Sequence, residues 1–365
     1  MALIAIDASR TTRKNKTGVE WYSYFLIREL LKIPSENKYI LYTNKPLPTE
    51  LLVGAVVNYK VKILKWPLKY FWTIIRMSVQ ILFDRPNLLF VPAHNLPIFL
   101  PKKTVITWHD IGYRRWPSYY NWVQKLSLFL GEKGALKADK IITVSQFSKK
   151  EMMDVLNVSE SKLAVIPLAV DYNQCFVREL QEQEKVMFKF SIKKPFFIFI
   201  GRLEDKKNIV RIIKAFNMFL NKTKSTCQLV LVGNPGFGYE KIINEINNSP
   251  YKNQIIKLGW LSQEQVACLF SACNGLIYAT NYEGFGMPVL EAHAYGKRVI
   301  VSKNTASSEL VNANDILVDN TSELAIANAM IDLLNENFIM QPVELNKYSW
   351  EETAKNTYNL INELL

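Results

Sequence analysis

Short apolar runs alternate with amphipathic stretches along the chain, and this alternation restricts the fold more than any other feature. Apolar runs typical of strands include "LIAID", "KYILYT", "TVITW" and "KIITVS" in the first half and "FFIFIG", "CQLVLVG", "GLIYAT" and "RVIVS" in the second. The stretches between them, such as "NIVRIIKAFNMFL", repeat apolar residues at the spacing of a helix. Alternating strands and helices form parallel sheets that carry helices on both faces. The sequence therefore predicts an α/β fold with doubly wound sheets.

The alternation occurs twice, which predicts two domains. The two series are separated by a polar, charged stretch that is weak in strand pattern and ends just before Pro195. We expect a first domain over residues 1–170, a linker over 171–194 and a second domain from residue 195. In sheets of this kind, ligands bind at the carboxyl ends of the strands. We therefore expect the ligand in a crevice at those ends, facing the other domain.

The positive charge of the chain is concentrated in its first half. The net charge is +12, but residues 1–170 hold 25 lysines and arginines against 12 acidic residues, whereas the remainder holds 20 against 21. A basic first half favours an anionic partner on that half alone: a nucleic acid, an anionic lipid or an acidic acceptor.

The cysteines and the apolar runs indicate the compartment. None of the four cysteines belongs to a CxxC pair, so we expect reduced thiols in a cytoplasmic protein. The opening "MALIAIDASR" meets Asp7 too early for a signal peptide and is interpreted as a first strand. No apolar run reaches the ~18 residues that a membrane-spanning helix needs.

The stretch "NYEGFGMPVLEA" places Glu283 and Glu291 on either side of two glycines and a proline. Pro288 suits the first position of a helix, so we expect Glu291 one turn inside that helix and Glu283 in the loop before it. Gly284 and Gly286 would let the backbone approach a ligand closely, and free N–H groups at a helix N-terminus favour a phosphate. The two carboxylates could then accept hydrogen bonds from sugar and ribose hydroxyls. The alternative is an ordinary strand–loop–helix turn.

The stretch "FIGRLEDKKN" supplies cations at the end of another expected strand. Arg202 closes the strand and Lys207 begins the next helix, so both should project into the crevice. A guanidinium and an ammonium there would neutralise a diphosphate and the charge of a leaving group. The alternative is that Lys206 and Lys207 form a solvated surface pair with the acidic Glu204 and Asp205. A further stretch, "VGNPGFGYE", has the spacing of neither phosphate-binding motif and is interpreted as a turn.

Taken in order, "GRLEDKKN", "QLVLVG", "NYEGFGMPVLEAHAYGKRVIVS" and "SSELV" resemble the retaining glycosyltransferases of family 4, the group 1 glycosyltransferases, which have the GT-B fold. The resemblance covers nearly the whole chain and is stronger in the second half. It implies two Rossmann-like domains facing each other across a cleft, of which the second, 195–345, binds the nucleotide sugar. It also implies that the closing segment, 346–365, returns as a helix to the first, acceptor-binding domain.

The resemblance assigns roles to the residues of the second half. In that family a basic pair holds the donor diphosphate, which implies this role for Arg202 and Lys207. The E-x7-E element is present in full, with Glu283 implied near the donor sugar and Glu291 at the nucleotide ribose. The backbone N–H groups implied to meet sugar and phosphate oxygens are those of Phe285, Gly286 and Met287.

The first half offers two further candidates. Gly18 matches the family's glycine loop before the first helix, although the segment from Asp7 to Gly18 is basic and has only this glycine. His109 matches a histidine that often touches the donor sugar, and it joins Arg202, Lys207 and Glu283 as a candidate catalytic residue. The alternatives are a mobile basic loop for the first and a hydrogen-bonded histidine at a strand end for the second.

Two segments of the first half mix basic with aromatic residues. One runs from Tyr59 to Phe83, and the other is "YRRWPSYYNW". Such mixtures suit an anionic membrane surface. We hypothesise that the first domain docks peripherally on the inner face of the plasma membrane, where it would reach a lipid-linked acceptor. The alternative is a core helix with a solvated basic side.

The expected reaction transfers a hexosyl unit from a GDP-, dTDP- or UDP-linked sugar to a sugar hydroxyl of a polyprenyl-linked or polysaccharide acceptor. The start of the chain and the "HD" pair resemble mannosyl- or rhamnosyltransferases of bacterial surface polysaccharide synthesis, such as that of lipopolysaccharide O-antigen. The resemblance implies retention of the anomeric configuration. We expect neither a cofactor beyond the sugar nucleotide nor a metal, because Arg202 and Lys207 would neutralise the diphosphate.

Two competing interpretations remain at this point. One is a GT-B-fold epimerase acting on a sugar nucleotide. The other is a basic nucleic-acid-binding protein, which explains the charge of the first half but not the residues around Glu283. We therefore expect no nucleic-acid partner.

Overall fold

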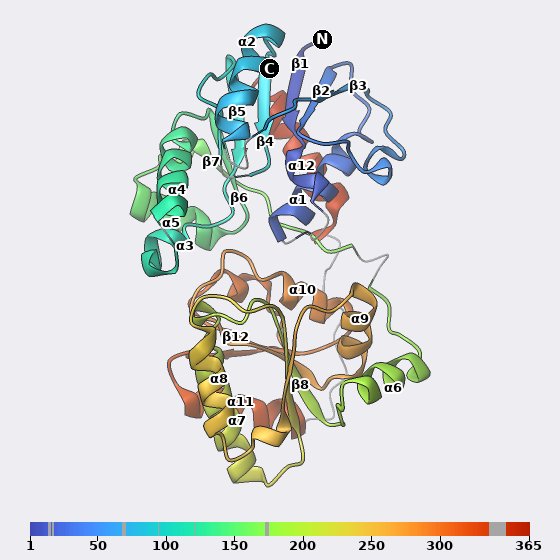
Figure 1. The fold of residues 1–365 in the computed structure, drawn as a ribbon, viewed down its shortest axis with the longest axis vertical. Coiled ribbons are helices and arrows are strands. Elements are labelled where there is room, and N and C mark those ends of the chain that lie inside the picture. The colour runs from blue at the N-terminus through green and yellow to red at the C-terminus, as the bar shows by residue number, and fades with distance from the viewer. Residues whose placement is uncertain are drawn as a thin grey trace. The chain divides into compact units, whose positions relative to one another are not determined.

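The computed structural model describes residues 1–365 except residues 14, 15, 17, 68–70, 94, 121, 172–174 and 336–347. The contacts between residues divide the chain into two compact units (Figure 1). Unit 1 comprises Met1–Ala169 and Asn346–Leu365, and unit 2 comprises Val170–Leu345. Each unit is built on one sheet of parallel strands, so the predicted α/β fold with two doubly wound sheets is confirmed.

Unit 1 contains a sheet of seven strands in the order β3-β2-β1-β4-β5-β6-β7, and all neighbours pair in parallel. The strands are β1 (Leu3–Asp7), β2 (Lys38–Thr43), β3 (Asn58–Ile63), β4 (Leu88–Val91), β5 (Lys103–Thr107), β6 (Lys140–Thr143) and β7 (Leu163–Val165). The helices are α1 (Gly18–Leu30), the π-helix η3 (Trp72–Met77), α2 (Ser78–Asp84), α3 (Gly112–Arg115), α4 (Trp122–Ala135), α5 (Gln146–Leu156) and α12 (Trp350–Asn362).

The strand order determines which face of this sheet each helix covers. Crossovers between parallel strands are right-handed, so connections that run in opposite directions along the sheet lie on opposite faces. The connections through α2, α4 and α5 run toward β7, and the connection through α1 runs toward β3. Helix α12 packs on α1, where the rings of Trp350 and Phe25 stack 5.2 Å apart. One face therefore carries α2, α4 and α5, and the other carries α1 and α12.

Unit 2 contains a sheet of six parallel strands in the order β10-β9-β8-β11-β12-β13. The strands are β8 (Phe196–Ile200), β9 (Gln228–Val232), β10 (Ile255–Leu258), β11 (Gly275–Tyr278), β12 (Val299–Ser302) and β13 (Ile316–Val318). The helices are α6 (Leu180–Lys189), α7 (Ile209–Thr223), α8 (Tyr239–Asn248), α9 (Gln263–Ala272), α10 (Met287–Ala294) and α11 (Glu323–Asn335). Figure 1 shows α7, α8 and α11 on one flank of this unit and α6 with α9 on the other.

The core of unit 2 forms around β8, whose sequence "FFIFI" is apolar throughout. Phe196, Phe197 and Phe199 are fully buried, and the Phe197 ring meets Phe219 of α7 in an edge contact at 5.6 Å. Burial of a side chain of this size stabilises a fold by ~1.5–3 kcal/mol. The buried strands thus hold in place the loops that follow their carboxyl ends.

The segment 171–194 contains regular structure. Helix α6 lies within it and packs against α9, and the Arg178 backbone N–H donates to the Ser271 hydroxyl at 3.0 Å. The predicted linker therefore includes a helix of unit 2, and its outer boundaries stay a prediction. Over the part of the chain that the structure describes, no helix combines the length and the apolar character needed to cross a membrane.

Candidate functional site

Two loops at the carboxyl edge of the six-stranded sheet lie side by side because β8 and β11 are neighbouring strands. The first follows β8 and contains Arg202 and Lys207, and the second follows β11 and contains Glu283. The Asn281 N–H donates to the Lys206 carbonyl at 2.9 Å. The strand order thus brings together two stretches that are 76 residues apart.

The side chain of Asn208 links the loop after β8 to two neighbouring segments by hydrogen bonds. Asn208 adopts a left-handed conformation (φ 60°), and its side-chain amide donates to the carbonyls of Ala279 (2.9 Å) and Asn320 (2.8 Å). An asparagine tolerates this backbone region better than most residues, and here its amide satisfies buried carbonyls at the same time. The loop before it is therefore held in one conformation.

Lys207 and Glu283 form an ion pair at the junction of the two loops. The Tyr278 hydroxyl, at the end of β11, donates to the same carboxylate oxygen at 2.7 Å, and the Lys207 ammonium lies 5.7 Å from the centroid of the Tyr278 ring. Lys207 is only 9% exposed, so it is not part of a solvated surface cluster. Burial, with the charge of Glu283 next in importance, raises the pKa of Tyr278 well above its ordinary value, so the phenol remains a donor.

Arg202 has a different environment. Its side chain is 67% exposed, and its Nε lies 4.0 Å from Oε2 of Glu204, whose Oε1 forms an ion pair with Lys206 at 3.4 Å. The guanidinium therefore has only a weak link to its own loop. An exposed guanidinium on a fixed backbone can form paired hydrogen bonds to phosphate oxygens at little cost in reorganisation.

The stretch "VGNPGFGYE" packs against the loop that contains Arg202. A Cβ on Gly233 would lie 1.9 Å from the Gly201 carbonyl oxygen, so the two backbones cross in direct contact. The Leu203 N–H then donates to the Asn234 carbonyl at 3.0 Å. This close contact leaves no room for a side chain at position 233 and therefore requires Gly233. The stretch is the turn that the sequence predicts.

Helix α10 begins beside the ion pair. Its N-cap is Gly286, one residue earlier than Pro288 alone suggests, with a φ of 115°. A Cβ there would lie 2.9 Å from the Ser307 Cβ, so both the conformation and the close approach require glycine. Phe285 is buried, and Met287 opens the helix. The predicted backbone donors thus occupy a fixed turn at a helix N-terminus.

Glu291 lies one turn inside α10, as predicted, and is half-buried. No hydrogen bond or ion pair reaches its carboxylate from any described residue. Burial raises its pKa from 4.5 to about 7. A half-buried carboxylate without a protein partner gains most from hydrogen-bond donors that a ligand brings.

Gly18 and His109 belong to unit 1. Gly18 is the first residue of α1, where a Cβ would meet nothing within 4 Å. Two described arginines of the segment before it, Arg13 and Arg10, pair with the buried Glu20 of α1 at 3.0 and 3.6 Å. His109 is buried, which fits both its predicted role and the alternative of a hydrogen-bonded histidine at a strand end.

The His109 ring meets the Tyr22 ring edge-on at 4.7 Å, and the Tyr22 hydroxyl lies 2.9 Å from the Thr107 hydroxyl. The His109 carbonyl accepts from the Ser148 hydroxyl at 3.2 Å. The histidine is thus positioned by α1 and by the first turn of α5.

Sequence reasoning missed Tyr278 and Asn208. Tyr278 is the only residue of "GLIY" with a polar group, and this position at the end of a buried strand was a usable signal. Asn208 directly follows Lys207, but its role depends on carbonyls that lie far away in the sequence.

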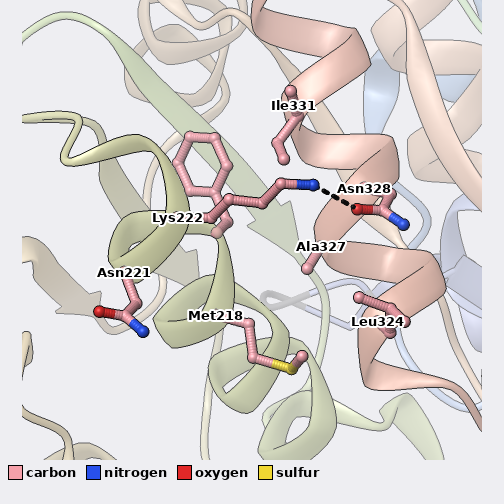
Figure 2. A pocket seen from close by; sticks show the side chains of 8 residues that line it. Met218, Asn221, Lys222, Leu324, Ala327, Asn328 and Ile331 are labelled. Atoms are coloured by element: carbon pink, nitrogen blue, oxygen red, sulfur yellow. Dashed lines mark hydrogen bonds between the residues drawn. The ribbon is translucent and has the colours of Figure 1, made fainter.

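A pocket in unit 2 lies between α7 and α11 and is lined by none of the predicted site residues (Figure 2). Lys222 and Asn328 meet across it at 3.4 Å. Among the described residues, no cluster of three or more His, Cys, Asp or Glu side chains could hold a metal ion.

The two α/β units, each with a parallel sheet, and the loops with Arg202, Lys207 and Glu283 at one sheet edge are typical of a two-domain transferase of the GT-B type. The sequence profile "Glycosyltransferase Family 4" matches residues 16–174, and the profile "Glycosyl transferases group 1" matches residues 181–355. The chain belongs to this family of glycosyltransferases and is a transferase enzyme. The resemblance inferred from the motifs is thereby confirmed.

Individual relatives agree with this placement. The O-antigen chain mannosyltransferase B of Escherichia coli is 26% identical over 278 residues, which are 73% of this chain and 72% of its own. The O-antigen chain mannosyltransferase RfbU of Salmonella typhimurium is 24% identical over 331 residues, 87% of each chain. The crystal structure of Anabaena HepE in complex with UDP and glucose matches with a TM-score of 0.72, at 15% identity over 99% of both chains, and shows the common fold.

Proposed function

We propose that this glycosyltransferase moves a mannosyl or rhamnosyl unit from a nucleoside diphosphate sugar to a sugar hydroxyl, with retention of configuration. The observation that carries this proposal is the cluster at the carboxyl edge of the second sheet. There the loops after β8 and β11 carry the exposed guanidinium of Arg202 and the Lys207–Glu283 pair, and α10, which contains Glu291, begins directly after the second loop.

The proposed donor site assigns one part of the ligand to each group. Arg202 and Lys207 bind the diphosphate, and the N–H groups of the turn at Gly286 meet its oxygens or those of the sugar. Glu283 accepts from hydroxyls of the donor sugar. Glu291 accepts from the ribose diol, which supplies two donors to a carboxylate that no described residue reaches with a hydrogen bond.

The proposed chemistry balances without a cofactor. The bond from the anomeric carbon to the diphosphate oxygen breaks, and a bond to the acceptor oxygen forms on the same face. The acceptor proton goes to the departing diphosphate. The two cations stabilise the charge of the leaving group, so the protein mainly positions both substrates and needs no metal. The predicted contacts of Gly18 and His109 with the donor stay part of this proposal.

Mannose is favoured because two relatives are named O-antigen mannosyltransferases, while rhamnose rests on the sequence motifs alone. The nucleotide is proposed to be GDP, dTDP or UDP; HepE was crystallised with UDP. We propose a polyprenyl-linked or polysaccharide glycan as the acceptor. The reaction would take place in the cytoplasm, at the anionic inner face of the plasma membrane.

The test begins with thermal-shift measurements against GDP, UDP, dTDP and their mannosyl, rhamnosyl and glucosyl derivatives. The best donor is then incubated with candidate glycan acceptors, with and without a metal chelator, and the product is analysed by NMR. We expect acceptor-dependent release of the nucleoside diphosphate, chelator resistance and a retained anomeric configuration. Conversion of the sugar nucleotide to its epimer without an acceptor would refute the proposal, and so would inversion at the anomeric carbon.

A further inference from the structure

Unit 1 exposes large apolar side chains that do not belong to the candidate donor site. Four of them lie along η3 and α2 at the spacing of one helix face: Ile75, Val79, Leu82 and Phe83. They are 42–78% exposed, although the opposite side of the same helices is buried in the core. A continuous apolar stripe on the outside of a helix is typical of a surface that contacts another protein or a membrane.

The stripe continues over the segment that follows β4. Ile98 and Phe99 are 63% and 49% exposed, and the Ile98 N–H donates to the Ser78 hydroxyl of α2 at 2.7 Å. Leu96 of the same segment lies 3.4 Å from where a Cβ on Gly134 of α4 would be. The segment therefore bridges α2 and α4, which share one face of the sheet.

Helix α4 extends the surface on the other side of this bridge. Trp122, Leu126, Phe129 and Leu130 recur at helical spacing and are 41–75% exposed. We call the surface formed by α2, the segment 98–99 and α4 the apolar face of unit 1.

The charges around the apolar face are unbalanced. Its acidic residues are occupied internally: Glu132 by Arg114 (2.8 Å) and Asp84 by the Tyr42 hydroxyl (2.9 Å) and Lys62. By contrast, Lys102, Lys125 and Lys133 have no acidic partner among the described residues. Lys133 instead lies over the Phe129 ring at 4.6 Å. The face thus has an apolar centre and cationic groups without counter-charges.

We propose that the apolar face docks unit 1 on a bilayer that contains anionic lipids. This docking proposal rests on the proposed function in one respect, because a lipid-linked acceptor would lie in a membrane. Apolar side chains enter the boundary between headgroups and acyl chains, and the lysines meet lipid phosphates. A second copy of the chain fits less well, because two such faces would bring the same unpaired lysines together.

The experiment is flotation of the full chain with phosphatidylcholine vesicles, with and without phosphatidylglycerol. The test variant is Phe83→Ser with Leu126→Ser, and the matched control is Phe188→Ser in α6 of unit 2, where the ring is 89% exposed. We expect the wild type and the control to float with anionic vesicles and the double variant to lose roughly tenfold or more in partitioning. Lys125→Gln with Lys133→Gln should weaken binding to anionic vesicles only.

Equal flotation of the wild type and the double variant would overturn the proposal, as would failure of the wild type to float with either vesicle. A concentration-dependent dimer that the double variant abolishes would assign the face to a second copy instead. Thermal melting and binding of the donor are measured on every variant. Absence of donor binding in all of them would count against the proposed function alone, because flotation does not depend on unit 2 binding a nucleotide sugar.

Discussion

Donor binding should depend on pH through Glu291. Burial raises the pKa of this carboxyl from 4.5 to about 7, so in the free protein it holds its proton below neutral pH. A ribose diol donates hydrogen bonds and therefore stabilises the ionised form. Affinity for the sugar nucleotide should be full above pH 7. It should fall about tenfold for each pH unit below 7, because each unit of pH is worth 1.36 kcal/mol of deprotonation.

The same shift affects folding with a defined sign. The folded state binds the Glu291 proton more tightly than the unfolded state does. The stability is therefore highest below pH 4.5, decreases as the pH rises and reaches its full loss above pH 7. The full shift corresponds to ~3 kcal/mol, and partial exposure of the side chain reduces this figure. Glu291→Gln should remove this part of the pH dependence and be relatively more stable at pH 8.

The assay is isothermal titration calorimetry with the sugar nucleotide between pH 5.5 and 8, in buffers of different ionisation enthalpy. A sugar nucleotide is used because the terminal phosphate of a bare nucleoside diphosphate titrates itself near pH ~6. We expect proton release on binding below pH 7 for the wild type and none for Glu291→Gln, whose affinity should be low but independent of pH. An affinity of the wild type that is constant from pH 5.5 to 8 would refute the assignment of Glu291 to the diol.

Three further substitutions test the rest of the donor site. Arg202→Ala removes an exposed cation, so the melting temperature should stay constant while the donor dissociation constant rises about 10- to 100-fold by calorimetry; unchanged affinity contradicts the assignment. Tyr278→Phe removes the hydroxyl that holds Glu283, so binding of the sugar nucleotide should weaken several-fold while binding of the nucleoside diphosphate is kept. Its matched control is Tyr42→Phe in unit 1, where a buried tyrosine also donates to a carboxylate, and equal losses for both ligands would exclude the positioning role. Gly286→Ala should lower the free energy of unfolding by on the order of 1–3 kcal/mol in urea, because the residue has a φ of 115° and little space. Gly18→Ala, in open space at the start of a helix, should cost nothing, and equal losses for the two would contradict this explanation.

Local sequence patterns predicted the structural features that depend only on residues close together in the chain. The apolar period indicated the strands and helices, and Pro288 placed the start of α10 to within one residue. In each case the physical cause lies within one or two turns of the chain.

The pairings of the site depend on strand order, which no local pattern contains. Arg202 and Glu283 share an edge because β8 and β11 are adjacent although β9 and β10 come between them in the sequence. The ion pair of Lys207 was not predicted for the same reason. The apolar face was only partly foreseen: the mixture of basic and aromatic residues up to Phe83 was visible, but the bridge from α2 to α4 follows from the path of the chain after β4.

The ion pair also limits what substitutions in the site can reveal. Lys207 and Glu283 are largely withdrawn from water, and removal of either leaves the other as a poorly solvated charge. A loss of activity after either substitution therefore combines a ligand contact with local destabilisation. Arg202 is mostly exposed and no described residue pairs with Glu291, so substitution of either leaves no buried partner charge behind. An Arg202 variant therefore separates donor binding from folding, and a Glu291 variant does so once its pH-dependent effect on stability is measured alongside.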